Sequence, residues 1–106
     1  MPFLGTYGSE IARANAPYTA NTNIDCSIDQ GNYIFSIRSG GVYHINLIVV
    51  CTYYDSADKS VQILVGSDYQ TTANTEVLHN GNNDGTFRFN ASRDFDGLVI
   101  RKVRLG

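Results

Sequence analysis

From residue 22 onward, apolar and polar residues alternate along most of the chain, and this period of two constrains the fold most strongly. The first clear stretch is Ile24-Asp25-Cys26-Ser27-Ile28, in which every second residue is apolar. Successive side chains on a β-strand point to opposite faces, so this spacing gives one apolar and one polar face. The pattern therefore predicts half-buried β-strands.

Stretches with this period are separated by turn residues, mainly Gly, Asn, Asp and Ser. We expect strands at residues 24–28, 33–38, 42–54, 61–65, 76–78, 87–89 and 98–105. Seven or eight short strands at such spacing are typical of an all-β, antiparallel β-sandwich with a jelly-roll-like form. In the last strand the apolar parity changes, which indicates a bulge near Arg101 and Lys102.

Residues 1–21 differ from the rest, because they contain both prolines and no strand alternation. We therefore expect an extended N-terminal arm over residues 1–21 and a β-sandwich domain over residues 22–106. The segment 9–14 could also form a single helical turn. Disordered tails are poor in large apolar side chains, so the arm should pack against its own sandwich or dock on a neighbouring subunit. The residues expected to do so are Phe3, Leu4, Tyr7, Ile11 and Tyr18.

The composition narrows the function classes. A formal net charge of −2 gives no electrostatic footprint for nucleic acid, and no apolar run approaches the length of a membrane span. The start of the chain lacks the pattern of a signal peptide. Charged residues make up only 17% of the chain, and Asn, Thr, Ser, Gly and Tyr take their place. Such a surface suits recognition through hydrogen bonds and aromatic rings.

No catalytic motif surrounds the two histidines or the two cysteines, and we expect neither an enzyme nor a cofactor. Cys26 and Cys51 both fall on apolar stripes, where buried free thiols are favoured over a disulfide. The loop from Asn80 to Gly85 matches the first half of a calcium loop, but its twelfth position is Ala91. A hairpin turn is therefore favoured over a metal site.

Tyrosines and loop residues are the candidate ligand contacts. Tyr53 and Tyr54 are neighbours on one strand, so one of them must face away from the core. With Tyr69, Asn82 and Asp84, they form a tentative ligand-binding set that would suit a sugar or a protein surface. The last 19 residues hold five of the eight basic residues, which either protect an edge strand or meet an acidic partner.

Two segments resemble known families. The run from Gly31 to Phe35, followed by the run from Gly41 to Leu47, looks like the strand openings of tumour-necrosis-factor-like jelly rolls, which are trimers. The ending from Phe95 to Leu105 is similar to the closing strand of jelly-roll carbohydrate-binding modules. The sandwich composition, the arm and the missing signal peptide together resemble small bacteriophage virion proteins, namely decoration (cement) proteins and tail-fibre tips.

These resemblances imply a non-catalytic virion component, made in the host cytoplasm, that assembles as a homo-oligomer, most simply a trimer, on capsid or tail proteins. The alternative is a carbohydrate-binding or host-receptor-binding module with a cell-surface glycan as its ligand.

Overall fold

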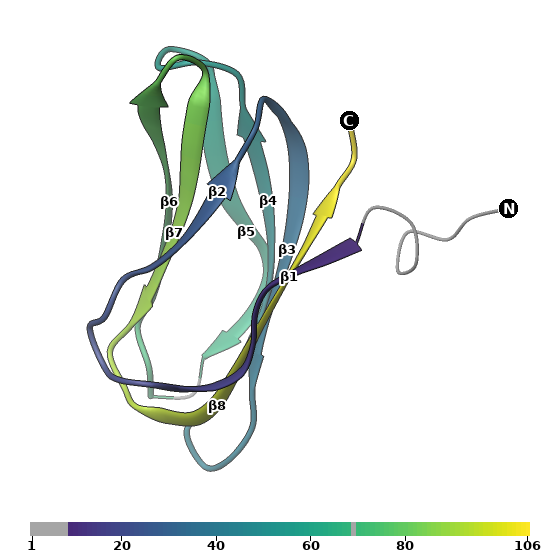
Figure 1. Ribbon diagram of the computed structural model, residues 1–106. Coiled ribbons are helices and arrows are strands. Elements are labelled where there is room, and N and C mark those ends of the chain that lie inside the picture. Colours follow the sequence, from purple (N-terminus) through teal and green to yellow (C-terminus); the bar gives the residue numbers. More distant parts are fainter. Residues whose placement is uncertain (1–8, 69) are drawn as a thin grey trace, which may run out of the picture.

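Eight strands make up the computed structural model, which describes residues 9–68 and 70–106. They are β1 (Ser9–Tyr18), β2 (Ile24–Ile28), β3 (Gly31–Ser39), β4 (Ile45–Tyr53), β5 (Lys59–Asp68), β6 (Ala73–Gly81), β7 (Asp84–Ala91) and β8 (Phe95–Arg104). One sheet has the order β1-β8-β3-β4-β5 and the other has the order β2-β7-β6 (Figure 1). The all-β antiparallel sandwich expected from the sequence is confirmed.

The pairings combine long-range and local connections. β8 lies between β1 and β3, and β7 pairs with β2, so the end of the chain closes both sheets against its beginning. These long-range pairings place strands from the two ends of the sequence side by side in each sheet. β3, β4 and β5 instead follow one another as antiparallel neighbours within the five-stranded sheet.

Aromatic and aliphatic side chains fill the space between the sheets, as the alternation requires. The rings of Phe35 on β3 and Phe87 on β7 stack with centroids 3.7 Å apart and planes 8° apart. Along β4 every second residue is buried, from Ile45 to Tyr53. Burial of this apolar area is the main stabilising contribution to the fold.

Tyr53 is held at one end of this core. Its ring is fully buried, and its hydroxyl lies 2.7 Å from Nδ1 of His79 and donates to the carbonyl of Asp84 at 2.8 Å. The ring packs directly on the backbone of β7 at Gly85, where a Cβ atom would lie 2.9 Å from two ring carbons. Glycine is therefore required at residue 85 for steric reasons.

The substitution Gly85→Ala tests this contact. The added methyl group forces the Tyr53 ring to move, so we expect a loss of about 1–3 kcal/mol in unfolding free energy. For a domain of this size, each kcal/mol lowers the melting temperature by roughly 4–8 °C. Gly40→Ala is the control, because nothing lies within 4 Å of a Cβ atom there. Equal melting temperatures for the two variants in calorimetry would contradict this packing.

The second half of the N-terminal segment belongs to the sandwich. β1 pairs antiparallel with β8 at the sheet edge, with three register shifts, so residues 9–14 form a strand and no helical turn. The shifts break the alternation, and Pro17 suits an edge strand. Tyr18 is buried, packs near Phe89 and Phe95, and binds the backbone of Ala91 in both directions. Of the two alternatives expected for the arm, Tyr18 therefore follows the first, because it packs against its own sandwich.

Of the remaining arm residues, Ile11 lies in β1 opposite Arg101. Phe3, Leu4 and Tyr7 lie outside the described residues.

The prediction of a bulge in β8 near Arg101 is wrong for its pairing with β3, since this pair keeps a regular register from Arg38 to Tyr33. Lys102 and Arg104 instead take core-side positions at the open end of the sandwich. Their cationic groups lie 5.9 and 5.8 Å from the centre of the Tyr33 ring, and they donate to the carbonyls of Ser27 and Gln30. Long basic side chains can cover an apolar edge in this way while their charge stays near water.

Both cysteines are free thiols, as favoured from the sequence. Cys51 is buried in the core, and Cys26 is half-buried at its margin. Burial raises the pKa of the Cys51 thiol to about 12, with a smaller contribution from Cys26. The reactive thiolate of Cys51 is therefore scarce at neutral pH.

Thiol labelling tests this difference. We expect iodoacetamide at pH 8 to modify Cys26 first in the folded protein, and Cys51 only when the chain unfolds. Mass spectrometry of digested samples, with and without guanidinium chloride, reports the labelled residue. Labelling of both residues at the same rate in the native protein would show that Cys51 is accessible.

Candidate functional site

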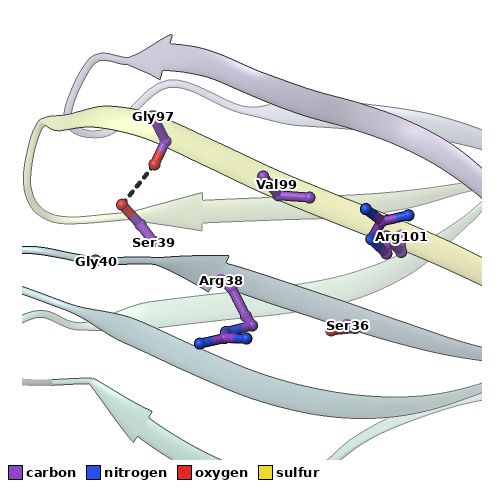
Figure 2. Close-up of a pocket in the computed structure, with 7 residues that line it drawn as sticks. All are labelled: Ser36, Arg38, Ser39, Gly40, Gly97, Val99 and Arg101. Atoms are coloured by element: carbon purple, nitrogen blue, oxygen red, sulfur yellow. Dashed lines mark hydrogen bonds between the residues drawn. The ribbon is translucent and has the colours of Figure 1, made fainter.

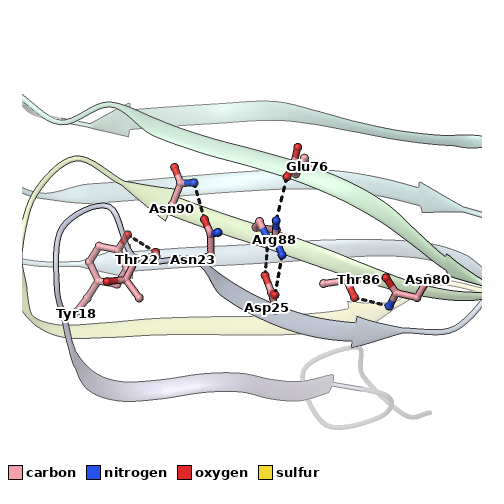
Figure 3. Close-up of polar contacts among 9 residues, drawn as sticks. All are labelled: Tyr18, Thr22, Asn23, Asp25, Glu76, Asn80, Thr86, Arg88 and Asn90. Carbon is pink, nitrogen blue, oxygen red and sulfur yellow. Dashed lines mark hydrogen bonds and ion pairs between the residues drawn. The ribbon is translucent and has the colours of Figure 1, made fainter.

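The two sheets present contrasting outer faces, defined as the faces turned away from the opposite sheet. On the three-stranded sheet this face is a polar network that spans all three strands (Figure 3). Arg88 on β7 forms a two-pronged ion pair with Asp25 on β2, at 2.8 and 3.0 Å, and lies 3.7 Å from Glu76 on β6. Amide and hydroxyl side chains extend this network on both sides: Asn23 with Asn90, Asn74 with Asn90, and Asn80 with Thr86.

This network satisfies its own polar groups. The hydrogen bonds from Arg88 lower the pKa of the Asp25 carboxyl, although burial opposes the shift. Both side chains are partly exposed, so the pair stabilises the fold only modestly. A face of this kind is suited to water.

The outer face of the five-stranded sheet carries an apolar stripe, which we call the outer stripe. Register places Val103 beside Ile34 and Ile34 beside Val50, while Ile48 lies opposite Val65. The stripe thus crosses from β8 through β3 and β4 to β5. Four of its five side chains are half-buried, and Val65 is exposed. No element among the described residues lies over this face.

At β5 the outer stripe meets an exposed sheet edge. β5 is the last strand of its sheet and pairs only with β4 in the described part of the chain. Ile63, Leu64 and Val65 are 40, 62 and 60% exposed. Such an edge leaves alternate backbone N–H and C=O groups available for another strand. A long, apolar edge strand is therefore a template for β-sheet addition.

Beside the outer stripe lies a basic hollow of about 360 Å³ between β3 and β8 (Figure 2). Arg38 and Arg101 line it together with Ser36, and the Ser39 hydroxyl donates to the carbonyl of Gly97 at its rim. Neither arginine side chain forms a hydrogen bond or ion pair with any described residue. The hollow can therefore accept acidic groups.

A second hollow, of about 340 Å³, contains Tyr54 at the end of β4. Tyr54 is 55% exposed. One of the two neighbouring tyrosines had to face away from the core, and that residue is Tyr54. Gln30, Asn32 and Thr52 also line this hollow. Their side chains are already bonded: Gln30 donates to the Tyr54 carbonyl, and Thr52 donates to Asn32.

The tentative ligand-binding set is only partly brought together. Tyr53 faces the core with no exposed ring, which corrects its expected role as a ligand contact. Tyr69 lies outside the described residues. Asn82 and Asp84 line a neighbouring hollow, and Gln30 borders both that hollow and the one with Tyr54.

The hairpin between β6 and β7 explains the Asn-rich loop. Asn82 and Asn83 have φ values of 51° and 64°, and Gly81 has a φ of 104°. Asparagine and glycine tolerate this left-handed region better than other residues, which agrees with the hairpin turn favoured from the sequence.

Among the described residues, no group of three or more His, Cys, Asp or Glu side chains could hold a metal ion. Nor does the described part of the chain include a helix long and apolar enough to cross a membrane.

The exposed β5 edge was missed by sequence reasoning, although one signal pointed to it. Ile63-Leu64-Val65 is a run of three apolar residues inside an alternating strand, so at least one of them must leave the core face. In the structure, the β4–β5 pair has a register shift at this run of apolar residues.

Comparison with protein-family models, with curated proteins and with solved structures finds no match for this chain.

Proposed function

We propose that this chain is a non-catalytic structural subunit that acts by assembling with copies of itself and with a larger particle. The observation that carries the proposal is the exposed apolar strand β5 at the edge of the outer stripe. Exposed apolar patches with polar surroundings are typical of protein interfaces. The contrast between the two outer faces supports it, because a bonded polar network covers the three-stranded sheet while the outer stripe crosses the five-stranded sheet.

The particle we infer is a bacteriophage virion, with the chain as a decoration protein or a tail-fibre component. This part rests on the resemblance in composition to small virion proteins. The basic hollow at Arg38 and Arg101 adds a place for acidic side chains of a capsid or tail protein.

Val65→Lys tests assembly through β5. A charge at this exposed position costs little in the free chain, within about 0.5 kcal/mol of unfolding free energy, but it opposes burial in an interface. We expect the wild-type chain to sediment as an oligomer and Val65→Lys to sediment as a monomer. Val42→Lys is the matched control, because Val42 is 76% exposed and lies in the turn between β3 and β4. A wild-type chain that stays monomeric at every accessible concentration contradicts the proposal.

The second candidate function is binding of a glycan at the end of the sandwich near Tyr54. It is favoured by the exposed Tyr54 ring in a hollow with the amide side chains of Gln30 and Asn32, since aromatic faces and amides suit sugar rings. A neighbouring hollow with Asn82 and Asp84 would lengthen the site.

A glycan array followed by titration tests this candidate. We expect Tyr54→Ala to weaken binding of any bound glycan by at least about tenfold, if stacking supplies 1.4 kcal/mol or more. Tyr43→Ala removes another partly exposed tyrosine and serves as the control. An array without bound glycans, or equal affinities for both variants, rejects the candidate.

A further inference from the structure

Strand β5 has features of a self-complementary edge. We infer that two copies of this chain pair through β5, antiparallel and about a two-fold axis between Ile63 and Leu64. This inference rests on the proposed assembly function and names its partner and register. The pairing joins two five-stranded sheets into one continuous sheet.

Charge selects this register. With Ile63 of one copy opposite Leu64 of the other, Lys59 at the start of β5 stands opposite Asp68 at the end of β5 in the second copy. The two-fold axis repeats this pair, so residues of opposite charge hold opposed register positions at both ends of the interface. Lys59 is exposed, and its side chain forms no hydrogen bond or ion pair with a described residue of its own chain. Directly opposed charges of opposite sign stabilise antiparallel strands.

The orientation of the side chains agrees with the same register. In the β4–β5 pair, Leu64 is the extra residue between Ile63, opposite Val49, and Val65, opposite Ile48. The proposed axis passes through this irregularity. The irregularity therefore changes the side-chain orientation only at the central pair, Ile63 and Leu64.

On either side of the axis, opposed residues share a face. Gln62 meets Val65 of the second copy, and both stand beside outward residues of β4, Val50 and Ile48. A slip of one residue would set inward residues against outward ones. A slip of two would separate Lys59 from its opposite charge.

The pairing also accounts for the exposed apolar residues. Ile63 and Leu64 meet at the axis, and the outer stripe continues through Val65 into the second copy. An isologous contact of this kind closes at two copies. It also removes the free edge that would otherwise invite unlimited sheet addition. The two-fold contact differs from the trimer that the tumour-necrosis-factor-like resemblance implies.

A charge swap tests the register by analytical ultracentrifugation of the purified full chain. Lys59→Glu and Asp68→Lys each set like charges opposite each other at both ends, and we expect each to weaken self-association about tenfold. The double variant K59E/D68K restores opposite charges and should return to near wild-type affinity. D96K is the control, since it makes the same charge change as Asp68→Lys at an exposed residue away from β5.

Cysteine cross-linking gives a second readout of the same register. Chains with Ser60→Cys mixed with chains with Ser67→Cys should form a disulfide-linked pair under mild oxidation, because residues 60 and 67 are opposed across the interface. Neither variant alone should link through its new cysteine.

The outcomes separate this inference from the proposed function. Self-association without rescue by the double variant and without the 60–67 link overturns the β5 register but leaves assembly standing. A monomeric wild-type chain overturns both.

Discussion

The mismatch between a five-stranded sheet and a three-stranded sheet governs the rest of the structure. The stacked rings of Phe35 and Phe87 join the sheets where β3 faces β7, and the buried side chains gather around this contact. Three strands cannot cover five, and β5 contacts the shared core through Val61 while its middle part stays exposed. Ile63 lies opposite the buried Val49, yet it is 40% exposed. The apolar edge is thus a direct consequence of how the sheets are matched.

The opposite edge of the same sheet shows how an edge can be closed. There β1 pairs with β8, and Tyr18 at its end turns into the core and binds the backbone of Ala91. β1 is irregular, with three register shifts and a proline, and such irregularity discourages further pairing. β5 has a single shift and a run of exposed apolar residues. The two edges therefore differ in their capacity to accept another strand.

Local patterning predicted the regular strands, because the buried residues of β2, β3 and β4 keep one parity over the length of each strand. It also predicted that one of Tyr53 and Tyr54 would be exposed. The strand β1 could not be found in this way, since its register shifts break the period of two. The run Ile63-Leu64-Val65 indicated that an apolar residue leaves the core face, but it could not place β5 at a sheet edge, because that depends on which strands pair. Lys102 and Arg104 show the same limit, since they occupy core-side positions only because the sandwich ends beside Tyr33.

The central claim is that β5 is a protein interface and not a free edge. Hydrogen–deuterium exchange of the β5 backbone amides, measured over a wide range of protein concentration, tests it most directly. If β5 pairs with another copy, its amides exchange more slowly as the concentration rises, while those of β2 on the polar sheet do not change. If the β5 amides exchange at the same rate at every concentration, β5 does not form the interface.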